Sequence, residues 1–308
     1  MPRRTLIAVL ATALALAAAG PAAAAPPFPS KIQLPSGWAP EGITAGAGTT
    51  IYVGSLAGGG VWAGNVRTGE GDVLVPAWGG AAVGVEYEAD ANRLWVAGGP
   101  TGTVRVYDAT SGDLLRAYTF GPAGALFLND LVVTDDAVYV TDSFNAWLDV
   151  IPLGPDDALP AVGDVTTLPL DGITFEPGFN VNGIVAARGW LIVVDSFTGG
   201  LFRVDPATGD ATELSTGGVS VSNGDGLELR GSTLYVVRNQ NHLVEVFRLG
   251  PELASAVPLG TLPPAGFPPE LLSVPTTAAV QAGRLWVVNA RFGITTTDYW
   301  VTQLPTNP

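Results

Sequence analysis

A unit of short strands that recurs six times is the feature that most constrains how this chain can fold. Each copy has a first strand, a tight turn and a second strand with an apolar, β-branched or aromatic core. The starts of the two strands are 9 to 11 residues apart in every copy, a regularity that unrelated strands would not show. Apolar runs bounded by Gly, Asn, Asp and Pro are typical of strands. The second strands begin at Ile51, Leu94, Val138, Leu191, Leu234 and Leu285.

Each unit continues with a third and a fourth strand, clearest at residues 102–113, where a Gly-containing turn follows a strand. The same turn chemistry recurs at 205–210 and, in part, at 65–70. Units of four strands that repeat every 42 to 53 residues are typical of propeller blades. The sequence therefore predicts an all-β fold, a six-bladed β-propeller. A β-sandwich, or a pair of sandwiches, is the alternative.

The last unit is one strand short, because only one more strand-like segment, residues 299–304, follows its second strand. The segment 31–34 (KIQL) belongs to no unit, so we expect this N-terminal strand to become the outer strand of the last blade and to close the ring. Two connections, 153–179 and 250–274, are longer than the rest and rich in Pro and Gly. They are expected either to be solvated surface or to form part of a mouth over a ligand.

Residues 1–25 have the pattern of a signal peptide, with two arginines, an apolar stretch and Ala-rich small residues. A buried N-terminal helix is the alternative, which Pro26 and Pro27 disfavour. Paired arginines fit both the general secretory and the twin-arginine route. We therefore expect residues 26–308 to form one secreted or extracytoplasmic propeller domain.

The chain is acidic, with 28 Asp and Glu against 14 Lys and Arg and a net charge of -14. Such a surface repels phosphate backbones and anionic headgroups, so nucleic acid and membranes are not expected partners, whereas divalent cations are favoured. Cysteine is absent, which excludes thiolate catalysis, zinc–thiolate sites and disulfides. A small-molecule ligand or substrate is the expected partner.

Oxygen-bearing side chains recur where the blades should meet at one rim of the channel. In a propeller, the first strand of each blade lines the channel and the second runs antiparallel beside it, so first-strand starts and second-strand ends share a rim. Rings of carboxylates and amides suit a hard cation with six to eight oxygen ligands. At any single position, a turn former bonded to its own backbone is the alternative. The set is Glu41, Asn129, Asn182 and Asp225 at first-strand starts, and Asp142, Asp195, Asn239 and Asn289 at second-strand ends.

These positions also carry a family resemblance that spans all six units. The segments that carry it are 40–42 (PEG), 127–130 (FLND), 179–183 (FNVNG) and 223–226 (NGDG). They resemble the metal-site motifs of the senescence-marker-protein and gluconolactonase-like propellers, with paraoxonases and strictosidine-synthase-like proteins as more distant relatives.

The resemblance implies a Ca²⁺ or other divalent ion held by Glu41, Asn182 and Asp225, with Asn129 as a ligand or a substrate contact. It also implies a hydrolase of lactones or related esters in which Asp225 activates water. A non-catalytic extracellular propeller, in which the cation only staples the blades and the rim binds a ligand or a protein, is the alternative.

The sequence departs from the family at two points. Phe127 stands where gluconolactonases of the family carry an arginine, which disfavours a gluconate-type substrate. Paraoxonases use histidines near the metal, whereas this chain has only His242. We expect His242 either to contact a ligand at the rim or to be solvated, and Asp142 and Asp195 to contact a substrate. The serines that follow these two aspartates lack a convincing base, so a structural role in the turn is expected for them.

Overall fold

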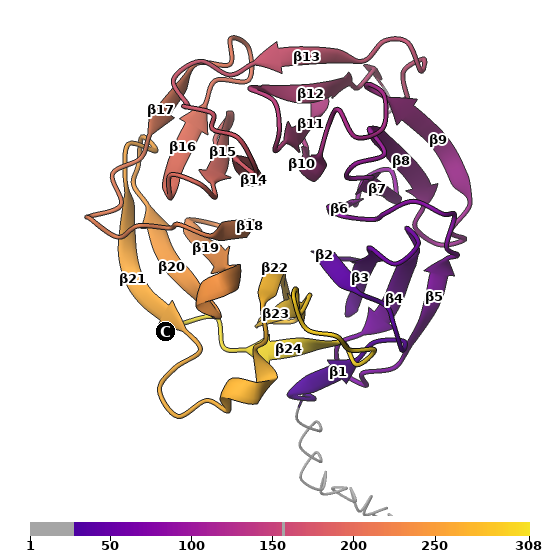
Figure 1. Cartoon of the computed structure of the whole chain (residues 1–308), viewed down its shortest axis with the longest axis vertical. Coiled ribbons are helices and arrows are strands. Elements are labelled where there is room, and N and C mark those ends of the chain that lie inside the picture. Colours follow the sequence, from indigo (N-terminus) through magenta and orange to yellow (C-terminus); the bar gives the residue numbers. More distant parts are fainter. Residues whose placement is uncertain (1–27, 156–157) are drawn as a thin grey trace, which may run out of the picture.

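The structure is a computed structural model that describes residues 28–155 and 158–308. The predicted signal peptide, residues 1–25, lies outside the described residues. Six four-stranded antiparallel sheets surround a central channel, which confirms the predicted six-bladed β-propeller (Figure 1). In the described ranges, no helix is long and apolar enough to cross a membrane. Two short 3-10 turns occur there, η2 (Asn239–Asn241) and η3 (Pro269–Leu271).

In the first five blades, the strands follow chain order from the channel to the outer edge. Blades one to three are β2 (Pro40–Ala45), β3 (Thr50–Ser55), β4 (Val61–Asn65) and β5 (Gly71–Val75); β6 (Val85–Glu88), β7 (Arg93–Ala97), β8 (Thr103–Asp108) and β9 (Leu114–Thr119); and β10 (Leu128–Val133), β11 (Ala137–Asp142), β12 (Trp147–Pro152) and β13 (Thr166–Pro169). Blades four and five are β14 (Val181–Ala187), β15 (Trp190–Asp195), β16 (Gly200–Val204) and β17 (Ala211–Glu213); and β18 (Gly224–Arg230), β19 (Thr233–Arg238), β20 (Leu243–Leu249) and β21 (Ala256–Leu262).

The sixth blade combines both ends of the fold. Its inner strands are β22 (Pro275–Gln281), β23 (Arg284–Asn289) and β24 (Trp300–Leu304), and its outer strand is β1 (Lys31–Gln33). β1 pairs antiparallel with β24, and Ile32 lies opposite Val301. Both side chains are buried, so the closing pair joins the core as well as the sheet. The prediction that an N-terminal strand closes the ring is therefore confirmed.

The hydrophobic core is divided into six clusters, one between each pair of neighbouring blades. A second strand such as β7 packs against a neighbouring blade on each face, so Leu94, Trp95 and Val96 are all fully buried. Strands that are buried on both faces need continuous apolar runs instead of alternating ones. This requirement explains the apolar signature that repeats in the sequence.

The innermost strands approach one another so closely that several positions admit only glycine. A Cβ atom on Gly42 would lie 2.2 Å from the carbonyl oxygen of Val83 in the next blade. On Gly183, it would lie 2.5 Å from the Asp225 oxygen and 2.6 Å from the Leu227 nitrogen. Because these neighbours are backbone atoms, they cannot turn aside as a flexible side chain would.

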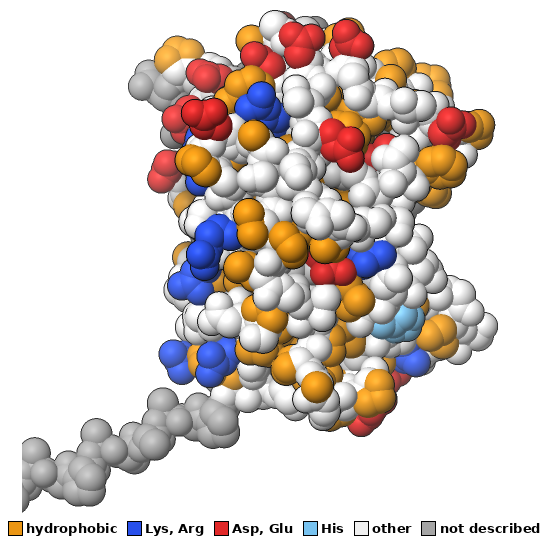
Figure 2. All heavy atoms as spheres, turned by 90° about the vertical axis from the view of Figure 1, so that its left-hand side faces the viewer, with side chains coloured by type: hydrophobic (Ala, Val, Ile, Leu, Met, Phe, Trp, Pro, Cys, Tyr) orange, Lys and Arg blue, Asp and Glu red, His pale blue; other side chains and the backbone are white. Residues whose placement is uncertain are grey.

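Charged side chains cover the outside of the ring unevenly. On the side shown in Figure 2, Asp and Glu gather over the upper part of the view, and Lys and Arg lie mainly toward its left edge. The acidic excess of the sequence, with its net charge of -14, therefore does not form one uniform shell on this side.

The close approach of the inner strands gives the first prediction. Gly183→Ala should lower the free energy of unfolding by about 1–3 kcal/mol, since the added methyl group overpacks rigid backbone. Urea unfolding at equilibrium measures the change. Gly163→Ala is the matched control, because no atom lies within 4 Å of its added Cβ. Equal stabilities of the two variants would contradict the explanation from close packing.

Candidate functional site

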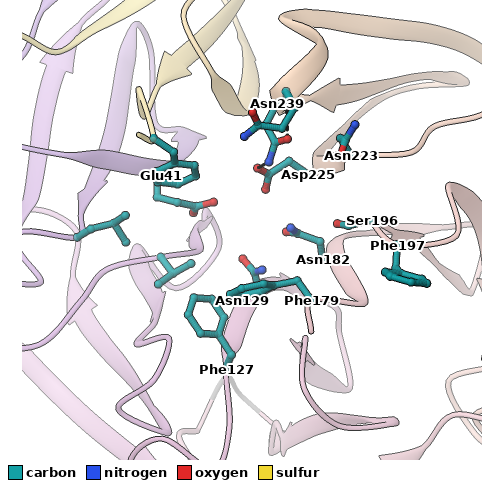
Figure 3. A pocket seen from close by; sticks show the side chains of 14 residues that line it. Glu41, Phe127, Asn129, Phe179, Asn182, Ser196, Phe197, Asn223, Asp225 and Asn239 are labelled. Atoms are coloured by element: carbon teal, nitrogen blue, oxygen red, sulfur yellow. Dashed lines mark hydrogen bonds between the residues drawn. The ribbon is translucent and has the colours of Figure 1, made fainter. Parts of the chain in front are cut away.

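A cavity of about 390 Å³ opens at one end of the central channel (Figure 3). This volume lies in the range of small-molecule sites. Asparagines and carboxylates form its polar side, and apolar side chains form the rest of the wall. The lining residues are Glu41, Leu56, Val83, Phe127, Asn129, Phe179, Asn182, Ser196, Phe197, Asn223, Asp225, Asn239, Gln240 and Phe292.

Four predicted ligands reach this cavity from four different blades because the inner strands bulge at their starts. The register of β2 on β3 shifts between Pro40 and Ile43, next to Glu41. Equivalent shifts occur in β10, β14 and β18, beside the other three ligands. A bulge places an extra residue in one strand and re-aims its side chain. The four side chains, Glu41, Asn129, Asn182 and Asp225, are only 3% to 8% exposed.

Glu41 carries a carboxylate that is buried in the wall of the cavity (Figure 3). Burial raises its pKa well above the usual range, and the nearby charges of Asp225 and Asp130 raise it further. In the described residues, no donor forms a hydrogen bond with this carboxylate. When Glu41 is ionised, its negative charge therefore has no hydrogen-bond donor among the described residues.

Asp225 faces the same space from β18. Asn239 donates a hydrogen bond of 2.7 Å from Nδ2 to Asp225 Oδ2, which fixes the orientation of the carboxylate. Burial raises the pKa of Asp225 to about 7, although the bond from Asn239 opposes the shift. A bound cation would favour the charged form of both carboxylates and reverse these shifts.

Asn129 is oriented by a chain of two hydrogen bonds that crosses between blades. Its Nδ2 donates to Ser143 Oγ at 2.9 Å, and Ser143 Oγ donates to the Val181 carbonyl at 2.7 Å. Because the amide nitrogen is engaged in this chain, the amide oxygen remains available as a ligand. Ser143 therefore orients the Asn129 amide and links two blades, in agreement with the structural role expected for it.

The donor set fits a hard divalent cation. Two carboxylates and several amide oxygens converge, and among the described residues that line the cavity none is Lys, Arg or His. Oxygen-only sets of this kind suit Ca²⁺. In residues 28–155 and 158–308, no three Asp, Glu, His or Cys side chains gather as a metal-binding group. The amides of Asn129 and Asn182 are thus needed to complete the ligand set.

Asp142 and Asp195, predicted as substrate contacts, are fully buried at two equivalent turns and do not line the cavity. Asp142 Oδ1 accepts hydrogen bonds from the backbone nitrogens of Phe127, at 3.0 Å, and Phe144, at 2.9 Å. Asp195 Oδ1 accepts one from the Phe197 nitrogen at 2.9 Å. These contacts support a role in holding the rim in shape.

His242 and Asn289 also lie outside the cavity lining. His242 is exposed, with its Nδ1 3.2 Å from the Leu272 carbonyl oxygen. Asn289 is buried and donates to Thr302 Oγ1 at 2.9 Å, a contact within its own blade. Of the seven predicted site residues, the structure thus brings together the four proposed ligands and leaves Asp142, Asp195 and His242 apart from them.

Several residues that line the cavity were not predicted as ligands, catalytic residues or substrate contacts. Asn239 stood in the predicted ring of oxygen donors, but its hydrogen bond to Asp225 could not be inferred from spacing. Phe179 is the first residue of the 179–183 motif, and Phe197 follows Asp195 by two residues; these positions were the available signal. The long connection 153–179 ends in the cavity through Phe179, whereas no residue of 250–274 lines it. Of the two long connections, one therefore contributes to the mouth.

A second cavity of about 220 Å³ also lies along the inner strands, where Glu86, Asp130 and Glu228 line it. Burial raises the pKa of Glu86 to about 8, and the charges of Glu228 and Asp130 add to the shift. Thr44 Oγ1 donates to Glu86 Oε2 at 3.1 Å and partly opposes it. Burial also raises the pKa values of Asp130 and Glu228 to about 7.

No protein-family model matches the sequence, and no curated protein matches it at a significant level. Among solved structures, the fold is similar to that of the major allergen Mala s 1 of Malassezia sympodialis. The TM-score is 0.66 at 15% identity, over 90% of this chain and 96% of that chain. It is also similar to the β-propeller domain of Cps50 (Swd1) from Myceliophteria thermophila, with a TM-score of 0.62 at 10% identity, over 89% and 99% of the chains.

A protein of unknown function from Bacteroides thetaiotaomicron gives a TM-score of 0.61 at 12% identity, over 88% of this chain and 70% of that chain. At such low identities, a common fold carries no information about activity. The comparisons therefore show a β-propeller and leave its chemistry to be argued from the cavity.

The raised pKa of Glu86 gives a prediction about pH. Between about pH 4.5 and 8 the unfolded chain releases the proton that folded Glu86 keeps, so the contribution of this group to stability falls as the pH rises. Because Glu86 is only partly buried, Glu86→Gln should raise the free energy of unfolding by about 2 kcal/mol near pH 9 and change it little near pH 4.

Urea unfolding at several pH values measures this effect. Asp130 and Glu228 face Glu86 and Arg230 lies near Glu228, so these residues are left unchanged. Glu70→Gln, at an exposed turn, is the control and should show the wild-type pH profile. If Glu86→Gln also shows the wild-type pH profile, the ionisation of Glu86 does not lower the free energy of unfolding, and the prediction is wrong.

Proposed function

We propose that this chain is an exported, divalent-cation-dependent hydrolase of lactones or esters, with Ca²⁺ as the preferred cation. The observation that carries the proposal is that Glu41, Asn129, Asn182 and Asp225, from four separate blades, line one cavity. Their residue types and order resemble the metal-site motifs of the gluconolactonase-like propellers. The composition of residues 1–25 supports export.

Glu41, Asn182 and Asp225 would hold the cation, and Asn129 would either hold it or contact the substrate. A divalent ion supplies Lewis-acid chemistry, since it draws electron density from the carbonyl group of an ester or lactone. The two carboxylates provide the negative charge that binding requires, and no basic side chain among the described lining residues competes for it.

Asp225 is the residue we assign to activate water. Its carboxylate is oriented by Asn239 and is accessible from the cavity, so it can accept a proton from a water molecule. The hydroxyl oxygen then bonds to the carbonyl carbon and the carbon–oxygen bond of the ester breaks. The proton held by Asp225 passes to the alkoxide that leaves, which restores the carboxylate.

The wall of the cavity restricts the substrate. Phe127 lines it at the position where gluconolactonases carry an arginine, and a phenyl ring cannot donate the hydrogen bonds to sugar hydroxyl groups that an arginine can. A gluconate-type substrate is therefore disfavoured. The net charge of -14 disfavours nucleic acid and anionic membrane surfaces, and for the hydrolase the partner is a small-molecule substrate.

A non-catalytic propeller is the second candidate. Here the same cation would staple the blades, and the mouth would bind a ligand or a protein. The exposure of Phe179 (48%) and Phe197 (58%) beside the cavity favours this alternative, because exposed aromatic groups often mark binding surfaces.

Cation binding gives a prediction that both candidates share. Adding Ca²⁺ to protein treated with a chelator should raise the melting temperature by about 5 °C, since a ligand bound only to the folded state stabilises it. Differential scanning fluorimetry with metal analysis measures this. Glu41→Gln should abolish the shift. A wild-type protein that contains no metal and shows no shift with any divalent ion would contradict the cation site.

Activity separates the two candidates. Asp225→Asn should lower hydrolysis of lactones and aryl esters by about a hundredfold or more, because the amide cannot accept the proton. The fold should survive, as the new amide oxygen can still accept the hydrogen bond from Asn239. Asp205→Asn, at an exposed turn, is the matched control and should keep full activity. Full activity of Asp225→Asn, or of the wild type in chelator, would contradict the proposed mechanism.

A further inference from the structure

Five phenylalanines surround the mouth of the cavity and form what we call the phenylalanine collar. Phe127, Phe179, Phe197 and Phe292 line the cavity, and the Phe144 ring packs against those of Phe127 and Phe179. Figure 3 shows Phe127 and Phe179 beside Asn129, with Phe197 near Ser196 on another side of the space. The collar therefore lies next to the oxygen donors without being part of them.

Three of the rings form one aromatic cluster although they come from separate segments. The ring centroids of Phe127 and Phe179 are 4.8 Å apart in an edge-to-face arrangement. Phe144 lies 5.5 Å from Phe127 and 5.2 Å from Phe179. Such contacts stabilise the orientation of each ring, so the cluster presents a fixed apolar surface.

Folding alone does not account for the collar, because four of its five members remain exposed. Phe144 and Phe292 are each 41% exposed, Phe179 is 48% exposed and Phe197 is 58% exposed. Exposed aromatic surface contributes little to the stability of the folded chain. Apolar side chains gathered at the mouth of a cavity are typical of a site that buries them against a ligand.

Buried polar side chains hold the collar in place. Asp142 binds the backbone nitrogens of both Phe127 and Phe144, and Asp195 does the same for Phe197 in the next blade. Asn180, which is fully buried, organises the loop that carries Phe179: its Nδ2 donates to the carbonyls of Glu176 (2.9 Å) and Gly178 (3.0 Å). The turns that carry these aromatic rings are thus held in place by hydrogen bonds from buried side chains.

The charges of the cavity restrict what can lie against the collar. Among the described lining residues, Glu41 and Asp225 are the ionisable ones, and both are acids. With the divalent cation of the proposed function bound, these two negative charges are balanced and the described lining carries no net charge, so it offers an ionic ligand no partner; a polyhydroxylated ligand would leave its hydroxyl groups unpaired against phenyl rings. An uncharged molecule with an apolar portion matches both the charge and the surface.

We infer that the phenylalanine collar binds the alkyl or aryl portion of an uncharged lactone or ester whose carbonyl group faces Asn129 and Asp225. The inference rests on the proposed function, since it assigns the substrate class of the same cavity. The collar sets specificity: it selects substrates with an apolar tail and excludes sugar lactones.

Nile red, an uncharged apolar fluorophore, tests the collar directly by fluorescence titration of the mature chain. The double variant Phe144→Ala/Phe179→Ala and the single variant Phe197→Ala should each weaken its binding about tenfold, as expected when a buried phenyl contact is lost. Leu259→Ala, an exposed apolar residue on the outer strand β21, is the control and should bind as the wild type does. A δ-decalactone competitor should displace the dye, whereas glucono-δ-lactone should not.

Unchanged Nile red binding in Phe197→Ala and in a folded double variant would overturn the inference, as would displacement by glucono-δ-lactone as strong as by δ-decalactone. Melting temperatures identify a double variant that fails to fold, and Phe197→Ala then decides alone. Hydrolysis separates the two proposals. If the collar variants weaken dye binding but the wild type hydrolyses no lactone or ester, only the proposed function is contradicted. If the protein hydrolyses these substrates and its preference for chain length is the same in the wild type and in both collar variants, only the collar is contradicted.

Discussion

The close approach of the inner strands is the constraint on which the rest of the molecule depends. At Gly42, Gly84, Gly183 and Gly226, a Cβ atom would lie 2.2 to 2.7 Å from an atom at the inner edge of the next blade. Only glycine fits there, and only because it fits can residues from four blades lie around one space about 390 Å³ in volume. A wider ring would separate Glu41 from Asp225, and the cavity would lose its common set of oxygen donors.

Buried negative charge is the second consequence of this narrow channel. Carboxylates lie in two cavities along the inner strands, with Glu41 and Asp225 in one and Glu86, Asp130 and Glu228 in the other. Burial raises the pKa values of all five. In the first cavity the carboxylates stand beside amide oxygens, and no described donor forms a hydrogen bond with the Glu41 carboxylate, which suits a cation. In the second every carboxylate accepts a hydrogen bond from the protein, as Glu228 does from the Val280 nitrogen at 2.8 Å, which suits a protonated or hydrated lining.

The repeat was enough to predict the blades, the closing strand and the convergence of the four proposed ligands, because strand order and strand ends follow from spacing. Side-chain direction does not follow from spacing. Asp142 and Asp195 lie at the predicted rim, yet their carboxylates accept hydrogen bonds from backbone nitrogens instead of lining the cavity. Strand spacing does not distinguish these two orientations. The phenylalanine collar depends on contacts between segments far apart in the sequence, and no local pattern reports such contacts. The β-bulges that aim Glu41 and its counterparts were likewise not predicted, although three of the four contain a glycine, at Gly42, Gly183 and Gly226, which was the available signal.

The closing pair of strands also determines how the ring would respond to mechanical force. Lys31 lies opposite Thr302 and Gln33 opposite Trp300, so the two ends of the fold leave this pair on the same side. Tension applied to those ends would load the hydrogen bonds between β1 and β24 one after another, as in a zipper, instead of all together. Three residue pairs join these strands, and backbone hydrogen bonds from Leu34 to Tyr299 and from Gln303 to Ser30 flank them. The strand pair that closes the ring is therefore also the pair that would separate first under tension.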